Sequence, residues 1–277
     1  MKGKINNFLI RSITTAVIII ATIFILYFSG NDMFIRLVAA VFASFSVYEF
    51  FNVTDTMEHE GFFVLMMIAA VVLPFVRIPY YKTVLAIAFI LACIVSVCMM
   101  LYKNRFHFGQ PTTPSMLSAV VILFFIAIPE LRAMENGLYY LLCSILICTT
   151  TDIAAYLIGK KWGKTKLIPA VSPNKTVEGA VAGIIVSFIF AVACGVVLQY
   201  TLGMIVNWKI YVQYALLTSA IGQFGDLTAS IIKRIANIKD YGVILPGHGG
   251  FLDRFDSHAF CFAFTYLFCA FGGTFLI

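Results

Sequence analysis

Four polar side chains lie near the end of a long apolar segment, where they could do chemistry. Asp226, Ser230, Lys233 and Arg234 share one face of a helix, because a helix turns about 100° per residue. A carboxylate inside an apolar segment is energetically costly unless a cation or a metal ion balances it. Asp226 therefore indicates a functional site. The alternative is a buried Asp–Lys pair that only holds two helices together.

Residues 239–256 are rich in polar residues and glycine. They hold three carboxylates, two basic side chains, a histidine, four glycines and a proline, which a plain connecting loop does not need. The candidate site residues among them are Lys239, Asp240, His248, Gly249, Gly250, Asp253, Arg254 and Asp256. Asp253 and Asp256 are three residues apart, so they face one way on a helix that begins here, with Asp226 across from them. Mg²⁺ takes one or two such carboxylates and completes its shell with substrate phosphates.

A glycine loop comes directly before this predicted helix. Residues 248–250 resemble a loop that feeds a helix N-terminus, whose free backbone N–H groups hold phosphate. Lys233, Arg234 and Arg254 supply charge-assisted hydrogen bonds to further phosphate oxygens. Acidic cluster, basic cluster and glycine loop together predict metal-assisted phosphoryl or nucleotidyl transfer.

A second group of polar residues lies further upstream, around a lysine-rich loop. Its candidate binding residues are Asp152, Tyr156, Lys164, Ser172, Asn174, Lys175 and Glu178. A turn over 172–176, with Glu178 just after it, predicts an ordered site for a phosphate or a lipid headgroup. The alternative is that the five lysines of this loop only set the membrane topology.

The composition of the chain decides which elements must position these groups. Of its 277 residues, 61% are hydrophobic and only 12% are charged, which excludes a soluble enzyme, a disordered chain and a collagen-like chain. The sequence therefore predicts an all-α, polytopic membrane protein with about nine transmembrane helices. The apolar stretches lie at roughly 12–30, 33–51, 61–76, 83–102, 116–129, 138–158, 179–206, 211–232 and 258–277.

The basic residues predict how the chain is oriented in the membrane. With the N-terminus in the cytoplasm, 14 of the 19 basic residues, Lys103 and Arg105 among them, lie on the cytoplasmic side. Two of the cytoplasmic loops, 159–178 and 233–257, hold most of the candidate site. We expect residues 1–137 to form a scaffold, a lipid cavity or a dimer surface, and residues 138–277 to form the catalytic region. Glu49, at the end of a predicted span, is expected to be interfacial.

The signature residues resemble those of a known family. The run from Ser230 through Lys233-Arg234, Lys239-Asp240 and His248-Gly249-Gly250 to Asp253-Arg254 and Asp256 is similar to the signature of the phosphatidate cytidylyltransferases, or CDP-diacylglycerol synthases. The resemblance implies transfer of CMP from CTP to phosphatidic acid, which yields CDP-diacylglycerol and pyrophosphate. It also implies dependence on Mg²⁺, with a second cation such as K⁺ beside it, and a homodimer in the bacterial cytoplasmic membrane. No nucleic acid partner is expected.

The residues suit this reaction. The attacking oxygen belongs to a phosphate monoester, which is largely ionised at neutral pH because its second pKa is about 6, so no strong base is needed. We expect a metal ion held by Asp226 and Asp253, together with Asp256, to bridge the CTP phosphates and stabilise the leaving pyrophosphate. The basic residues of the signature would neutralise the α-phosphate or the lipid phosphate. Which loop holds which substrate is left open.

Two other functions were compared with this one. A transferase that moves a phosphatidyl group from CDP-diacylglycerol to an alcohol would show widely spaced Asp-Gly, Ala-Arg and Gly–Asp–Asp elements, and no such run occurs here. An ion or anion transporter would place ionisable groups along a path across the bilayer, often with an internal repeat. In this sequence the first five spans hold no comparable path.

Overall fold

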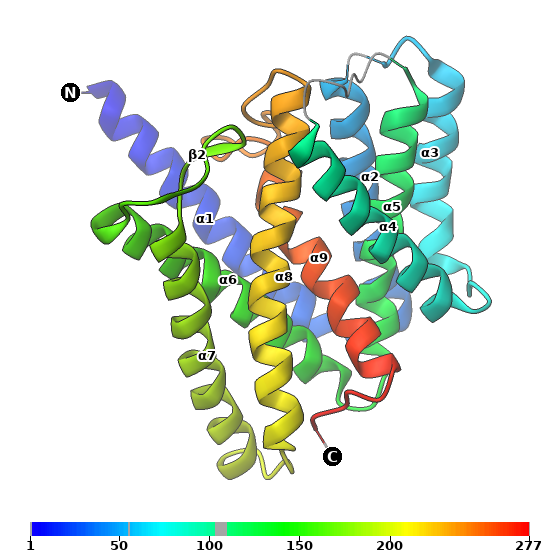
Figure 1. The fold of residues 1–277 in the computed structure, drawn as a ribbon. Helices are drawn as coiled ribbons and strands as arrows, with labels where there is room; N and C mark the ends of the chain where they lie inside the picture. The colour runs from blue at the N-terminus through cyan, green and yellow to red at the C-terminus, as the bar shows by residue number, and fades with distance from the viewer. Residues whose placement is uncertain (1, 55, 103–109, 277) are drawn as a thin grey trace.

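The computed structural model describes residues 2–54, 56–102 and 110–276, and Lys103 and Arg105 lie outside these ranges. Within them the chain forms a bundle of long helices with one small hairpin (Figure 1). The elements are, in chain order, α1 (Lys2–Phe28), α2 (Asp32–Val53), α3 (Glu60–Val72), the 3₁₀ helix η1 (Leu73–Phe75), α4 (Tyr81–Leu101), α5 (Thr112–Arg132), α6 (Gly137–Trp162), β1 (Lys166–Ile168), β2 (Ser172–Thr176), α7 (Val177–Tyr200), α8 (Trp208–Ile235) and α9 (Leu252–Ala270).

A helix forms over each of the nine apolar stretches, because an apolar segment in a bilayer must satisfy its backbone hydrogen bonds internally. Within the described ranges, seven of these helices are long and apolar enough to cross a membrane. They are α1, α2, α4, α5, α6, α7 and α8. The chain is therefore a helical membrane protein. The nine predicted spans are supported for these seven helices, and stay a prediction for α3 and α9.

The loop between α6 and α7 differs from the all-α prediction. β1 and β2 pair as an antiparallel hairpin, and the expected turn over 172–176 is an extended strand in the structure. The end of this strand is fixed by the helix that follows. The hydroxyl of Thr176 accepts a hydrogen bond from the backbone N–H of Gly179 at 3.2 Å, as an N-cap of α7. The backbone of Thr176 is itself extended, so β2 can pair with β1 up to the residue that caps α7.

The polar loops gather at one end of the bundle. Figure 1 shows the β1–β2 hairpin and the α8–α9 loop at the end where the N-terminus lies, with the C-terminus at the opposite end. The prediction that the polar loops share one side is therefore confirmed for these two loops. Which side of the membrane this end faces stays a prediction.

Aromatic packing joins the first part of the chain to α9. Phe42 of α2 lies with its ring centroid 5.7 Å from Phe125 of α5, 4.9 Å from Phe251 and 4.8 Å from Phe255. Such contacts add to the burial of apolar surface. They place the beginning of α9 against the first-half helices, so residues 1–137 help to position the catalytic region.

Helices α6 and α7 approach each other closely along small residues. A Cβ atom built on Gly179 would lie 2.6 Å from the carbonyl oxygen of Ala155 and 2.9 Å from the Cα of Gly159. In a membrane, where the hydrophobic effect adds little between helices, small residues let two backbones pack directly against each other. The close contact holds together the ends of α6 and α7 that the hairpin connects.

We expect Gly179→Ala to destabilise the protein, because the added methyl group overlaps the α6 backbone. Overpacking of this kind costs about 1–3 kcal/mol of the free energy of unfolding. Thermal unfolding of the purified protein in detergent measures the change. Gly61→Ala is the matched control, since nothing lies within 4 Å of a Cβ atom there. Equal melting temperatures for the two variants would contradict the close-packing argument.

Candidate active site

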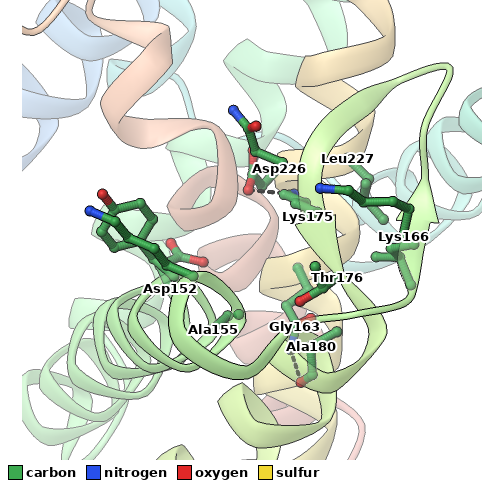
Figure 2. Close-up of a pocket in the computed structure, with 15 residues that line it drawn as sticks. Asp152, Ala155, Gly163, Lys166, Lys175, Thr176, Ala180, Asp226 and Leu227 are labelled. Atoms are coloured by element: carbon green, nitrogen blue, oxygen red, sulfur yellow. Dashed lines mark hydrogen bonds and ion pairs between the residues drawn. The ribbon is translucent and has the colours of Figure 1, made fainter.

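A cavity of about 540 Å³ opens between α6, α7, α8 and the β1–β2 hairpin (Figure 2). Asp152 and Tyr156 line it from α6, Asn174 and Lys175 from β2, and Asp226 from α8. Asp226, from the first group of candidate residues, therefore lies at one cavity with several residues of the upstream group. The long helices bring their carboxylates to the cavity, and the hairpin brings lysines over it.

Two carboxylates, Asp152 and Asp226, line this cavity, and a third lies near them. Asp226 of α8 lies within electrostatic range of Asp152 on α6 and of Asp256 on α9. The ammonium group of Lys175 reaches from β2 and forms an ion pair with Asp226, which Figure 2 marks with a dashed line. Like charges at short range repel, so this cluster needs cations beside it. The structure supplies one from the hairpin.

The predicted face of α8 is confirmed by the contacts of its side chains. The hydroxyl of Ser230 lies 3.5 Å from a carboxylate oxygen of Asp226, one helical turn away. One turn further, the ammonium group of Lys233 donates to Asp253 of α9 at 2.7 Å. The polar face of α8 therefore connects the carboxylate cluster to the beginning of α9.

Asp253 is the most fully engaged of the predicted metal ligands. Besides Lys233, its carboxylate accepts hydrogen bonds from the backbone N–H groups of Tyr241 at 2.8 Å and of Gly250 at 2.9 Å. Its side chain is only 3% exposed. Burial also raises the pKa of the neighbouring Tyr241 well above its usual value, so that phenol stays neutral. Asp253 thus fixes the α8–α9 loop in this structure, and its role as a metal ligand stays a prediction.

Glu49 has a role that the sequence reasoning missed. It is 1% exposed, and its carboxylate accepts hydrogen bonds from the backbone N–H groups of Phe251 at 2.6 Å and of Leu252 at 2.7 Å. A carboxylate is favourable there, because the first N–H groups of a helix have no partners within it and carry partial positive charge. Glu49 therefore caps the start of α9 as a buried side chain, and its expected place near the membrane interface stays a prediction.

This contact also corrects the prediction for the glycine loop. The N–H groups at the start of α9 were expected to be free for a phosphate, but Glu49 and Asp253 already occupy those of residues 250–252. Gly250 is needed instead because a side chain at this position would collide with Glu49. A Cβ atom on Gly250 would lie 2.5 Å from a carboxylate oxygen of Glu49. Binding of substrate by His248, Gly249 and Gly250 stays a prediction, without these N–H groups as its basis.

The two predicted arginines hold loop backbone. Arg234 donates to the carbonyl oxygens of Val171 at 3.2 Å and Ile238 at 3.1 Å. Arg254 donates through two nitrogens to the carbonyl oxygen of His248, at 3.0 and 2.8 Å. Both guanidinium groups therefore order the loops around the site in this structure, and their contact with phosphate stays a prediction.

The other predicted binding residues lie around these loops rather than in the cavity. Glu178 accepts from the backbone N–H groups of Lys164 at 3.1 Å and Thr165 at 3.0 Å, so it closes the loop before β1. The remaining ones that do not line the cavity are Ser172, which is half-buried, and Lys239 and Asp240, which are exposed.

The cavity is also lined by residues that were not among the predicted binding residues, including Lys166 and Gln223. Lys166 projects from β1, and Gln223 lies on α8 one turn before Asp226, where its amide donates to the carbonyl oxygen of Ala180 at 3.0 Å. Gln223 was detectable in principle, because a polar residue three positions before Asp226 lies on the same helix face.

The donor set fits a Mg²⁺ ion. Among the described residues, no three acidic, histidine or cysteine side chains already form a complete metal-binding group. Mg²⁺ does not need one, because it usually takes one or two carboxylates and fills its shell with water and substrate phosphates. Asp226 supplies such oxygens at the cavity, where it forms an ion pair with Lys175, and Asp256 lies within electrostatic range of Asp226.

We expect Glu49→Gln to loosen the beginning of α9. A neutral amide has one acceptor oxygen, so one of the two N–H groups at Phe251 and Leu252 loses its partner. A buried hydrogen bond to a charged group is worth about 1.5–3 kcal/mol. The expected result is a lower melting temperature together with a lower turnover rate. Glu60→Gln, at an exposed acidic residue at the start of α3, is the control; a Glu49→Gln variant as stable as this control would refute the capping role.

The sequence from residue 10 to residue 271 matches the cytidylyltransferase family. A phosphatidate cytidylyltransferase of Staphylococcus aureus (strain COL) is 42% identical over 187 residues, or 68% of each chain. That of Bacillus subtilis (strain 168) is 39% identical over 171 residues, which cover 61% of this chain and 62% of the relative. That of Staphylococcus haemolyticus (strain JCSC1435) is 33% identical over 258 residues, which cover 91% of this chain and 95% of the relative. Because the family match covers nearly the whole sequence, the chain belongs to the cytidylyltransferase family and is a nucleotidyltransferase.

Proposed function

We propose that this enzyme transfers CMP from CTP to phosphatidic acid, giving CDP-diacylglycerol and pyrophosphate for phospholipid biosynthesis. The observation that carries the proposal is the meeting of Asp152, Asp226 and Asp256 beside a lysine-lined cavity at one end of a membrane bundle. A site that must bring a polyanionic nucleotide to a membrane lipid needs this combination of metal-binding acids and cations. The activity named for its relatives supports the same substrates.

The cavity next to the hairpin is the proposed CTP site. Lys160, Lys166 and Lys175 surround it, and their charges suit a triphosphate. Tyr156 lines the same cavity, is 64% exposed and lies 5.7 Å from the ammonium group of Lys160, so its ring offers a stacking face for the cytosine base. In this proposal the hairpin gathers the nucleotide, so CTP is assigned to the loop between α6 and α7.

Mg²⁺ is the proposed cofactor, held by Asp226 and Asp256. When bound, it would neutralise the CTP phosphates and stabilise the leaving pyrophosphate. Asp253 is the remaining predicted ligand, and it can contribute only if Lys233 moves, because that ammonium group holds one of its oxygens. With Asp152 the cluster holds three carboxylates. A single Mg²⁺ ion is usually bound by one or two carboxylates, so the additional negative charge supports a second cation such as K⁺.

The side chains of the protein then have to position two anionic substrates, CTP and phosphatidic acid. An oxygen of the phosphatidic acid phosphate forms a bond to the α-phosphorus of CTP, and the bond from that phosphorus to the bridging oxygen of pyrophosphate breaks. No protein nucleophile is needed, and the attacking phosphate is already largely ionised. Lys175 and Lys233, which now neutralise Asp226 and Asp253, are placed to move to substrate phosphates.

The proposed reaction takes place at the cytoplasmic face of the cell membrane. The excess of Lys and Arg in the loops at the end of the bundle that holds the site supports this orientation. The family resemblance also supports a homodimer. A transporter is less well supported, because the ionisable cluster sits at one end of the bundle instead of following a path across it.

We expect Asp226→Asn to abolish transfer while leaving the protein folded, because it removes a charged metal ligand. The assay uses purified protein in detergent with radiolabelled CTP and phosphatidic acid, with and without Mg²⁺, and follows label in the lipid phase. Lys209→Ala is the control, since Lys209 lies near the start of α8, far along the helix from the site. Failure of the unaltered protein to label lipid with any divalent metal would refute the proposed function; near-normal rates for Asp226→Asn would remove that residue from the metal site.

Lys175→Ala should weaken the binding of CTP. Loss of one charge-assisted contact to a phosphate raises the KM for CTP about tenfold or more, and removal of the partner of Asp226 adds to the loss. Lys161→Ala is the matched control, because Lys161 is exposed, does not line the cavity and lies over the Trp162 ring. If both variants change the KM for CTP equally, the lysines act only through the overall potential of the loop, and the assignment of Lys175 fails.

A further inference from the structure

Helix α1 touches the loop between α8 and α9 at the tip of that loop. In the described part of the chain, only 6% of the α1 segment from Ile10 to Phe28 is buried. Figure 1 shows this helix crossing the bundle obliquely. Its contacts with the loop are therefore among the few that fasten it to the bundle.

The tip of the loop is a tight turn over residues 245–248. The backbone N–H of His248 donates to the carbonyl oxygen of Leu245 at 2.9 Å, with Pro246 and Gly247 between them. Gly247 has a φ of +76°, as the third position of a type II turn requires, and proline is common at the second position. The sequence of the turn therefore defines its shape, but not how it is held against the bundle.

Two neighbouring threonines of α1 bind this turn. The hydroxyl of Thr14 donates to the carbonyl oxygen of Pro246 at 2.9 Å, and the hydroxyl of Thr15 lies 3.2 Å from Nε2 of His248. The helix itself is equally close, because a Cβ atom on Gly247 would lie 3.0 Å from Cγ of Arg11. One face of α1 therefore rests directly on the turn.

These contacts are additional to the ordinary bonds of threonine in a helix. A threonine in a membrane helix commonly donates to a carbonyl oxygen one turn earlier in the same helix. Thr22 of α1 does this, with its hydroxyl 2.8 Å from the carbonyl oxygen of Ile18. Thr14 and Thr15 make the same kind of bond at 3.0 Å, but they also reach the turn. Thr22 is therefore a natural reference for their role.

The contact with Thr15 orients the ring of His248. When Thr15 donates to its own helix, its oxygen can accept the proton of Nε2, so both bonds form at once. Nδ1 of the same ring is buried and has no partner among the residues whose side chains the structure describes. Within that part of the chain, Thr15 alone fixes the imidazole by hydrogen bonding.

The turn passes its position on to the beginning of α9. Arg254 donates through two nitrogens to the carbonyl oxygen of His248, at 3.0 and 2.8 Å. Arg254 directly follows Asp253 and lies two residues before Asp256, and the sequence predicts that it neutralises a substrate phosphate. A displaced turn would therefore move the guanidinium group of Arg254.

The other end of α1 is fixed separately. The ring centroids of Phe24 and Phe28 lie 6.0 and 5.9 Å from that of Phe34 on α2. Aromatic contacts thus hold one end of the helix, and the two threonines hold the other. Because both ends are fixed, the helix can act as a strap between α2 and the turn.

We propose that α1 is a strap that holds the 245–248 turn in its working position, with Thr14 and Thr15 as positioning residues for the transfer. They act through His248 and Arg254 rather than on a substrate. The proposal rests on the proposed function, because the position of Arg254 matters for turnover. It gives the N-terminal helix a part in the reaction, although the helix lines neither the cavity nor the carboxylate cluster.

The test removes the two hydroxyls but keeps the size and branching of the side chains. We expect Thr14→Val/Thr15→Val to lower the kcat of CMP transfer about tenfold and to leave the KM for CTP unchanged, because the lysines of the cavity stay in place. Thr14→Ser/Thr15→Ser retains both hydroxyls and should keep the rate of the unaltered protein. Thr22→Val, on the same helix, is the matched control and should also keep that rate.

A second measurement does not depend on turnover. Hydrogen exchange at the backbone N–H groups of Leu245 and His248 should be faster in the valine variant than in the serine variant or the Thr22→Val control, because both groups are bonded within the loop tip. Equal exchange in the three proteins would overturn the proposal, as would an equally low kcat in the valine and serine variants or a raised KM for CTP with an unchanged kcat. Faster exchange in the valine variant of a protein that transfers no CMP in any form would refute the proposed function while keeping the strap.

Discussion

The repulsion among Asp152, Asp226 and Asp256 is the interaction on which the rest of the structure depends. Three carboxylates from three helices meet at the polar end of a membrane bundle, where the low dielectric strengthens both repulsion and attraction between charges. Such a cluster is stable only when cations balance it. The hairpin supplies Lys175 and α8 supplies Lys233, and each forms an ion pair with a carboxylate. The same excess of negative charge is the basis on which we propose a metal ion here.

The beginning of α9 has to be held in place for this cluster to form. Glu49 provides the anchor, because its carboxylate takes two N–H groups of a helix that follows it by about 200 residues in the chain. Asp253 ties the same helix end to Lys233 and to the backbone of the α8–α9 loop. Phe42 packs against Phe251 beside these contacts. A charge on α2 thus helps to fix where Asp256 stands, and the first-half helices take part in positioning the cluster.

Much of this arrangement could be predicted from the sequence, because its signals are local. Apolar stretches of membrane length give helices, and the spacing of Asp226, Ser230 and Lys233 predicts one helix face, which the contacts confirm. The role of Glu49 could not be predicted. Its partners are backbone N–H groups about 200 residues further along the chain, and backbone groups carry no signal in the sequence. The hairpin was missed for a related reason: its strands of three and five residues depend on the cap that Thr176 gives to α7. Asp152 was recognised as polar and well spaced, but only the packing of α6 against α8 and α9 brings it to the other two carboxylates.

The position of the cluster follows from the two solvents that the substrates come from. In the proposed reaction a nucleoside triphosphate cannot enter the hydrocarbon, and the chains of a membrane lipid do not leave it, so the proposed transfer has to happen where a polar cavity and an apolar one share a wall. In this chain the wall is α8, which presents Asp226 to the polar side and Gly225, Thr228 and Ala229 to the apolar side. Small residues on the apolar side keep that wall thin: a Cβ atom on Gly225 would already lie 3.0 Å from the ring of Phe260. The scarcity of charge in the sequence follows from the apolar helices, and the charges of the candidate site gather at the level of the membrane where the proposed substrates would meet.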